Sequence, residues 1–318
     1  MGIIKVQNLT KKYGAFYAVD HISFEVERGT MLGFLGVNGA GKSTTINLLS
    51  TLLLPDEGTG ELCGYTIGKQ DQQIRQRIGI VYQQNCLDEL LSVKENLLCA
   101  GVLHGAKKRD AELQIKRVCK ILNMEDILKK RYQTLSGGQK RRCEIAAALM
   151  HTPQILFLDE PTTGLDPATR QDVWAAIADL QKKENITIFL TTHYMEEAAG
   201  ADKIVILDHG KIVTEGTAFE LKEKYAEDKL RLYFKSADGD MRQKLMARLG
   251  KKKKAVLLQN GGIEIGIRST KEAIPILNAL LDQMDGFEVI QGNLDDVFLN
   301  AVSAAEKTGR RTGQLLKQ

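Results

Sequence analysis

Short apolar runs alternate with stretches in which apolar residues recur at helical spacing over the first two thirds of the chain. The runs are rich in Ile, Leu, Val and Phe, which is typical of strands buried on both faces of a parallel sheet. This alternation predicts an α/β domain with a largely parallel sheet. The expected strands are residues 31–36, 77–83, 154–159, 186–192 and 203–213.

Two segments predict antiparallel pairing beside that sheet. Residues 203–213 contain His209-Gly210 between two β-branched runs, a pattern that indicates a hairpin. Residues 3–9 and 22–26 alternate apolar and polar positions, and we expect them to form an antiparallel edge sheet.

The segment 94–131 has a different period. Its apolar residues recur at helical spacing with charged residues between them, so we expect a helical insertion into the α/β core. The positions that carry this pattern are Leu97, Leu98, Val102, Leu103, Leu113, Ile115, Val118, Ile121 and Leu122.

A second, smaller domain is expected after a charged stretch at 222–230. Beyond it the pattern predicts strand 230–235, helix 240–249, strands 255–259 and 263–268 around a turn, helix 270–285 and strand 287–291. The order βαββαβ suggests a ferredoxin-like α+β module. The expected division is therefore 1–222, with a helical subdomain at about 84–150, then a small domain over 223–304 and a mobile basic tail over 305–318.

Composition narrows the function classes. The 318 residues are 43% hydrophobic and 26% charged, with a net charge of +4, so the chain is ordinary globular protein and gives no reason to expect a nucleic-acid partner. No secretory or myristoylation signal and no membrane span is predicted. The five cysteines include no CxxC pair, which favours reduced thiols over a disulfide or zinc site.

Residues 36–44, GVNGAGKST, match the spacing of a P-loop between an apolar strand and a helical run. Its glycines let backbone N–H groups converge on phosphate, and the helix N-terminus adds positive potential. We expect Lys42 to reach the β- and γ-phosphates of a bound nucleotide and Ser43 to bind Mg²⁺. The candidate nucleotide-binding residues are Gly36, Val37, Asn38, Gly39, Ala40, Gly41, Lys42, Ser43 and Thr44.

Three further side chains follow apolar strands and complete a candidate catalytic group. Asp159 ends the strand 154–159 and is expected to hold Mg²⁺ through water, because ligands bind beyond the carboxyl ends of parallel strands. Glu160 comes next and is expected to orient or deprotonate the attacking water. His193 follows the strand 186–192 and is expected to donate a hydrogen bond to the γ-phosphate.

The string LSGGQ (135–139) opens another helical run and makes a second N-terminal anion site. With this string the sequence resembles the ATP-binding cassette (ABC) ATPases over residues 1 to about 222. In that family two copies face head to tail, and the signature of each closes over ATP held by the P-loop of the other.

The resemblance implies roles for further residues. Tyr13 matches the aromatic residue that stacks on adenine, although it could also be a strand-end aromatic. Gln83 matches the glutamine that senses Mg²⁺ and the transmembrane partner, with Gln84 as the neighbouring alternative. Ser136, Gly137, Gly138 and Gln139 match the signature, and Gly164-Leu165-Asp166 matches the loop where two copies communicate, with Asp166 near the nucleotide. The departures are Val37, where proline is frequent, and Thr163, where serine is frequent.

The resemblance implies an ATP-hydrolysing subunit that forms a dimer, most simply a homodimer, and powers a separately encoded permease from the inner face of the cell membrane. The ending NLDDVFLNAV (293–302) is similar to cassette ATPases of the drug-export type, which favours an exporter of drugs, lipids or peptides. Two alternatives stay open: a soluble cassette ATPase acting on ribosomes or DNA, and a module that binds ATP as a structural ligand. A single P-loop and the lack of a long coiled coil between Lys42 and Ser136 disfavour the first, and the joint presence of Glu160 and His193 disfavours the second.

Overall fold

The computed structural model describes residues 2–234, 255–259, 261–267, 269–281 and 284–315. The chain divides into two compact units, Met1–Thr217 and Ala218–Gln318. The division falls at the beginning of helix α7 (Ala218–Tyr225), so residues 218–222 group with the second unit.

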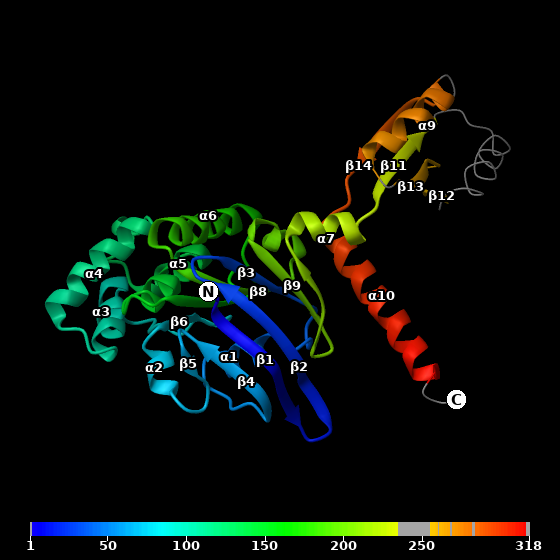
Figure 1. The fold of residues 1–318 in the computed structure, drawn as a ribbon. Coiled ribbons are helices and arrows are strands. Elements are labelled where there is room, and N and C mark those ends of the chain that lie inside the picture. Colours follow the sequence, from blue (N-terminus) through cyan, green and yellow to red (C-terminus); the bar gives the residue numbers. More distant parts are fainter. Residues whose placement is uncertain (1, 235–254, 260, 268, 282–283, 316–318) are drawn as a thin grey trace. The chain divides into compact units, whose positions relative to one another are not determined.

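The first unit is built on a six-stranded sheet with the strand order β10-β9-β3-β8-β7-β6. All neighbouring strands pair in parallel except β9 and β10, which form the hairpin expected at His209-Gly210. The buried runs therefore form the expected parallel sheet (Figure 1). Its strands are β3 (Met31–Leu35), β6 (Ile78–Val81), β7 (Ile155–Asp159), β8 (Thr187–Thr192), β9 (Lys203–Asp208) and β10 (Lys211–Gly216).

A second, antiparallel sheet belongs to the same unit and has the strand order β2-β1-β4-β5. The expected edge sheet is thus present, with longer strands than the alternation predicted. Its strands are β1 (Gly2–Tyr13), β2 (Phe16–Glu27), β4 (Glu57–Leu62) and β5 (Tyr65–Thr66).

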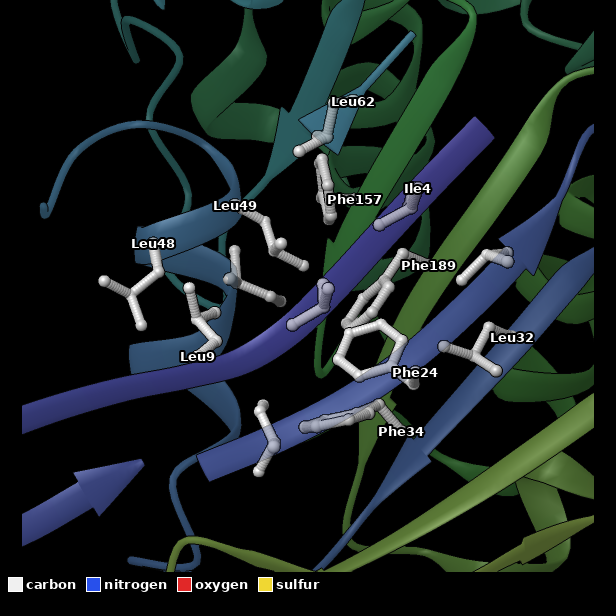
Figure 2. Packing of buried hydrophobic residues seen from close by; sticks show 14 of the residues in the cluster. Ile4, Leu9, Phe24, Leu32, Phe34, Leu48, Leu49, Leu62, Phe157 and Phe189 are labelled. Carbon is white, nitrogen blue, oxygen red and sulfur yellow. The ribbon is translucent and has the colours of Figure 1, made fainter. Parts of the chain in front are cut away.

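The main core of the first unit lies between these two sheets and around helix α1 (Lys42–Leu49). Phe24 of β2, Phe34 of β3 and Phe189 of β8 form a cluster with ring centroids 5.2–6.0 Å apart, and Phe157 of β7 joins it (Figure 2). Burying side chains of this size contributes about 1.5–3 kcal/mol each, so the cluster fixes β3, β7 and β8 relative to one another. The functional segments follow the carboxyl ends of these three strands.

The insertion between β6 and β7 is helical, as its period predicted. It contains α3 (Val93–Leu103), α4 (Lys108–Ile121) and α5 (Gly137–Ala148), with short 3₁₀ turns η1 (Glu125–Ile127) and η2 (Tyr132–Thr134). A capping box between Ser92 and Glu95 starts α3. The remaining helices of this unit are α2 (Asp71–Arg75), α6 (Pro167–Glu184) and the 3₁₀ helix η3 (Met195–Gly200).

The second unit contains an antiparallel sheet with the order β12-β13-β11-β14. Numbered along the chain, that order is second, third, first, fourth, as a ferredoxin-like module requires. The helix expected at 240–249 lies outside the described residues. The observed elements are β11 (Asp228–Tyr233), β12 (Ala255–Leu257), β13 (Ile263–Ile267), η4 (Thr270–Glu272), α9 (Ala273–Leu280) and β14 (Gly286–Ile290).

The end of the chain differs from the expectation. Helix α10 spans Leu294–Leu315, so the segment expected as a mobile tail from residue 305 is helical as far as Leu315. Residues 303–315 contain no proline, and the glycines at 309 and 313 cost about 1 kcal/mol each relative to alanine without removing a backbone donor. Among the helices that the structure describes, none is both long and apolar enough to cross a bilayer.

Candidate functional site

The loop between β3 and α1 packs closely against strand β2. Gly41 has a φ of 107°, and a Cβ at this position would lie 2.3 Å from the carbonyl oxygen of Ala18, so only glycine fits. Lys42 follows as the first residue of α1 and is 4% exposed. Its Nζ donates to the carbonyl oxygens of Gly36 (2.8 Å) and Val37 (3.2 Å), so the ammonium group is held inside the loop.

Asp159 joins this loop to the central strands. It ends β7 opposite Thr191 of β8, whose hydroxyl donates to Asp159 Oδ1 at 2.5 Å. The hydroxyl of Ser43 donates to the same oxygen at 3.3 Å. The sequence placed Ser43 and Asp159 together as a metal pair, and the structure does bring them together; the contribution of Thr191 was not predicted.

Glu160 lies at the centre of a polar cluster. Its φ of 45° marks a sharp turn after β7, and its backbone N–H donates to Thr191 O at 3.1 Å. His193 Nδ1 donates to Glu160 Oε2 at 3.0 Å, and Gln83 Nε2 lies 3.5 Å from the same oxygen. Lys42 Nζ lies 3.4 Å from Oε1, so a buried carboxylate faces a cation on one side and an imidazole on the other.

Arg141 of α5 binds the backbone next to this cluster. It is 4% exposed and donates to the carbonyl oxygens of Tyr82 (2.5 Å) and Asp159 (3.1 Å). Burial lowers the pKa of Arg141 to about 10, while the carboxylates of Glu144 and Asp159 oppose that shift. Sequence reasoning missed this arginine, although it lies two residues after the signature.

One cleft of about 600 Å³ is lined by Lys42, Ser43, Gln83, Glu160 and His193, while Asp159 and Arg141 lie outside its described lining. The predicted residues Tyr13 and Gln83 are part of its lining, whereas Gln84 is not, which favours Gln83 in that pair of alternatives. Phe16 was not predicted; the aromatic residues at 13 and 16 around a Gly-Ala turn were the available signal. The lining consists of Tyr13, Phe16, Ala18, Asn38, Gly39, Gly41, Lys42, Ser43, Thr44, Gln83, Glu160, Thr163 and His193.

The signature residues lie elsewhere in the same unit. Ser136 is the N-cap of α5 and forms a capping box with Gln139, in which Gln139 N donates to Ser136 Oγ at 3.3 Å. A Cβ on Gly138 would lie 2.2 Å from Thr169 Cγ2, so glycine here lets α5 approach α6 closely. Asp166 is the N-cap of α6. None of residues 136–139 and 166 belongs to the described lining of the cleft.

The parallel sheet, the loop ahead of α1 and the acidic pair at the end of β7 define a P-loop nucleoside triphosphatase. The comparisons with known proteins make this class specific. Residues 19–163 match the family described as "ABC transporter". The chain is 42% identical over 224 residues to the doxorubicin resistance ATP-binding protein DrrA of Mycobacterium tuberculosis, covering 70% of this chain and 67% of the relative. It is 36% identical over 306 residues to the daunorubicin/doxorubicin resistance protein DrrA of Streptomyces peucetius, covering 93% and 91%.

Solved structures agree with this result. CbiO1 from Clostridium perfringens, part of the ABC transporter complex cbiONQ, has a TM-score of 0.66 at 28% identity, covering 79% of this chain and 96% of that protein. A dimeric post-hydrolysis state of the ATP-binding cassette MJ0796 with ADP and Pi has a TM-score of 0.59 at 28% identity, covering 67% and 98%. The chain therefore belongs to the ABC transporter family, and it is an ATP-binding, ATP-hydrolysing member of it.

Proposed function

We propose that this chain is the ATPase subunit that powers a separately encoded transmembrane exporter from the cytoplasmic face of the membrane. The relatives named for doxorubicin, daunorubicin and linearmycin resistance support export, and drugs, lipids or peptides are the proposed cargo classes. The ribosome- and DNA-directed alternative has no relative of that description among these.

The cleft fits ATP. The ammonium group of Lys42 and the backbone N–H groups at the start of α1 suit the phosphates. Tyr13 and Phe16 belong to the same lining and are 52% and 59% exposed, so an aromatic face is available to adenine. We assign Tyr13 the stacking role and the P-loop residues 36–44 the phosphate role.

The oxygen donors beside the phosphate site suit Mg²⁺. Ser43 offers a hydroxyl, Asp159 a carboxylate and Gln83 an amide oxygen, the hard ligands that this ion prefers. Among the described residues no group of three His, Cys, Asp or Glu side chains could hold a metal alone, which fits an ion bound largely by phosphate and water. When bound, Mg²⁺ would neutralise developing charge on the phosphates.

Glu160 is the proposed general base. His193 and Gln83 contact one of its oxygens and Lys42 lies beside the other, so the carboxylate is held in a fixed position from which it can accept a proton from water. Because His193 uses Nδ1–H toward Glu160, donation to the γ-phosphate would come from Nε2, and both bonds together require the imidazolium form.

The observation that carries the proposal is the separation of two anion sites within one cassette. The P-loop, Glu160 and His193 share a cleft from which Ser136, Gly137, Gly138 and Gln139 are absent. A second copy of the chain, facing the first, would bring its signature to the γ-phosphate and Asp166 to the shared interface. Contacts that exist only in the closed pair would let ATP binding drive dimerisation.

Replacing Glu160 with Gln tests this assignment. Glu160→Gln keeps the side chain's size but removes the base, so we expect ATP turnover to fall by about 10²–10⁴-fold and an ATP-bound dimer to accumulate. Steady-state turnover and size-exclusion chromatography with ATP measure the two effects. Glu125→Gln, at an exposed position of η1, is the matched control and should behave as the unchanged chain does. Rapid turnover by Glu160→Gln would refute the role given to Glu160.

A further inference from the structure

Glu197 is another buried carboxylate, and its contacts reach segments next to Glu160 and His193. Glu197 of η3 is 5% exposed on its side chain and comes four residues after His193. It accepts hydrogen bonds from the hydroxyls of Thr162 and, at 2.7 Å, Thr192. Arg170 Nε of α6 lies 3.4 Å from Oε1, an ion-pair distance. One carboxylate thus joins the segment after Glu160, the end of β8 and α6.

Arg170 extends this contact in two directions. One Nη donates to the carbonyl oxygen of Leu165 at 3.4 Å, inside the loop 164–166. The guanidinium group stacks on the ring of Tyr194 with 4.3 Å between Cζ and the ring centroid. A planar, delocalised cation is suited to both contacts at once, whereas an ammonium group is not.

The ring of Tyr194 lies against both Arg170 and His193. Its ring centroid lies 4.1 Å from that of His193, and its backbone N–H donates to Thr192 Oγ1 at 3.0 Å. Thr192 Oγ1 is also the group that donates to Glu197. Since His193 contacts Glu160, the series runs without a gap from the loop 164–166 to the general base.

Because the carboxylate of Glu197 is buried, its contacts depend on one another. A carboxylate removed from water is costly unless its partners remain in place, and losing one partner leaves an incompletely compensated buried charge. Any movement of the loop 164–166 that displaces Arg170 therefore also disturbs Glu197 and the ring beside His193.

We propose that Glu197 and Arg170 are positioning residues that hold His193 and the loop 164–166 in one fixed relation. The pair acts on hydrolysis and not on ATP capture, because neither side chain belongs to the described lining of the cleft. This inference rests on the proposed roles of Glu160 and His193. It adds a route by which the loop expected to meet a second copy is linked to the catalytic residues of its own chain.

The test uses the full chain and the variants Glu197→Gln, Arg170→Gln and the double variant. We expect each single variant to lower kcat by about 10-fold or more, with KM for ATP and the calorimetric affinity for ATP within about twofold of the unchanged chain. Because the two side chains act as a unit, the double variant should lose little more than either single one. A single variant leaves one buried charge without its partner and could fold poorly for that reason. The double variant removes both charges, so its kcat still tests the proposal in that case.

Two controls separate this role from a general loss of structure. Asp172→Asn changes an exposed residue on the same helix and should leave kcat unchanged. Arg170→Lys keeps the charge and should recover only part of kcat, since it loses the stacking on Tyr194. An unchanged kcat in Glu197→Gln, a parallel loss of ATP affinity, or additive losses in the double variant would each overturn the proposal. Failure of the unchanged chain to hydrolyse ATP would instead contradict the proposed function.

Discussion

At the scale of single residues, the contacts of His151 show which of its ring nitrogens carries the proton. Its Nε2 lies 2.8 Å from the carbonyl oxygen of Ile78, and a carbonyl only accepts, so Nε2 carries the proton. Nδ1 is buried and has no hydrogen-bond partner in the described part of the chain. The ring stacks on that of His104 with centroids 3.9 Å apart. Burial, followed by the charge of His104, lowers the pKa of His151, while the bond to Ile78 opposes the shift.

A lowered folded-state pKa predicts acid sensitivity. Below the ordinary pKa of about 6.5 the unfolded chain binds a proton at this position that the folded chain does not, so stability falls as the pH drops through that value. His151→Gln keeps a donor for Ile78 and does not titrate. We expect its melting temperature to fall less between pH 7.5 and 5.5 than that of the unchanged chain, as measured by calorimetry. Equal losses in both proteins would contradict the assignment.

At the scale of elements, hydrophobic periodicity predicted the strands of the six-stranded sheet because β7 and β8 are buried along their whole length. It also predicted the helical insertion and the order of the second unit's described strands. It failed for residues 305–315, where a polar, basic composition does not by itself exclude a helix. It could not supply the contacts of Asp159 with Thr191 and Arg141, because these depend on strand register and on how α5 packs.

Arg141 shows what such an unpredicted contact contributes. From α5 it holds the carbonyl oxygens of Tyr82 and Asp159, which follow β6 and end β7. Arg141→Lys keeps a cation but cannot reproduce the planar fork, so we expect the loss of one charged hydrogen bond, about 1.5–3 kcal/mol. At about 2–4 °C per kcal/mol for a unit of this size, the melting temperature should fall by several degrees, and ATP turnover should fall with it.

The neighbouring arginine provides the control for that prediction. Arg142 uses a single Nη1 to contact the carbonyl oxygens of Leu122 and Asn123, away from the cleft. A lysine can replace a single donor more easily, so Arg142→Lys should be milder and should leave turnover unchanged. Equal melting temperatures and equal ATP turnover of the two variants would mean that Arg141 does not stabilise the site.

At the scale of the whole molecule, the motifs form two sets, one lining the cleft and one outside its described lining, and the resemblance assigns the second set to the P-loop of another copy. Lys42, Gln83, Glu160 and His193 come from four separate segments and meet in one cleft, because each follows a strand of the same sheet or the loop beside it. Ser136 and Asp166 start helices of the same unit outside that cleft. The proposed contact between the signature and the P-loop forms between two copies of the chain, so the structure of one copy does not contain it.

Mixing two inactive variants tests this two-copy site directly. Lys42→Ala removes the phosphate-binding cation and Ser136→Ala removes the signature hydroxyl, which also serves as a helix cap worth about 1 kcal/mol. Each variant alone should lose turnover, and Ser136→Ala should still bind ATP. In a symmetric pair, a mixed dimer combines Ser136 from one copy with Lys42 from the other and so contains one intact site, and an equal mixture should recover roughly a quarter of the unchanged activity. The recovered turnover per chain should fall on dilution as dimers dissociate. Full activity of either variant alone would show that the replaced group is not needed for turnover, and a mixture that recovers none would show that each copy completes its own site.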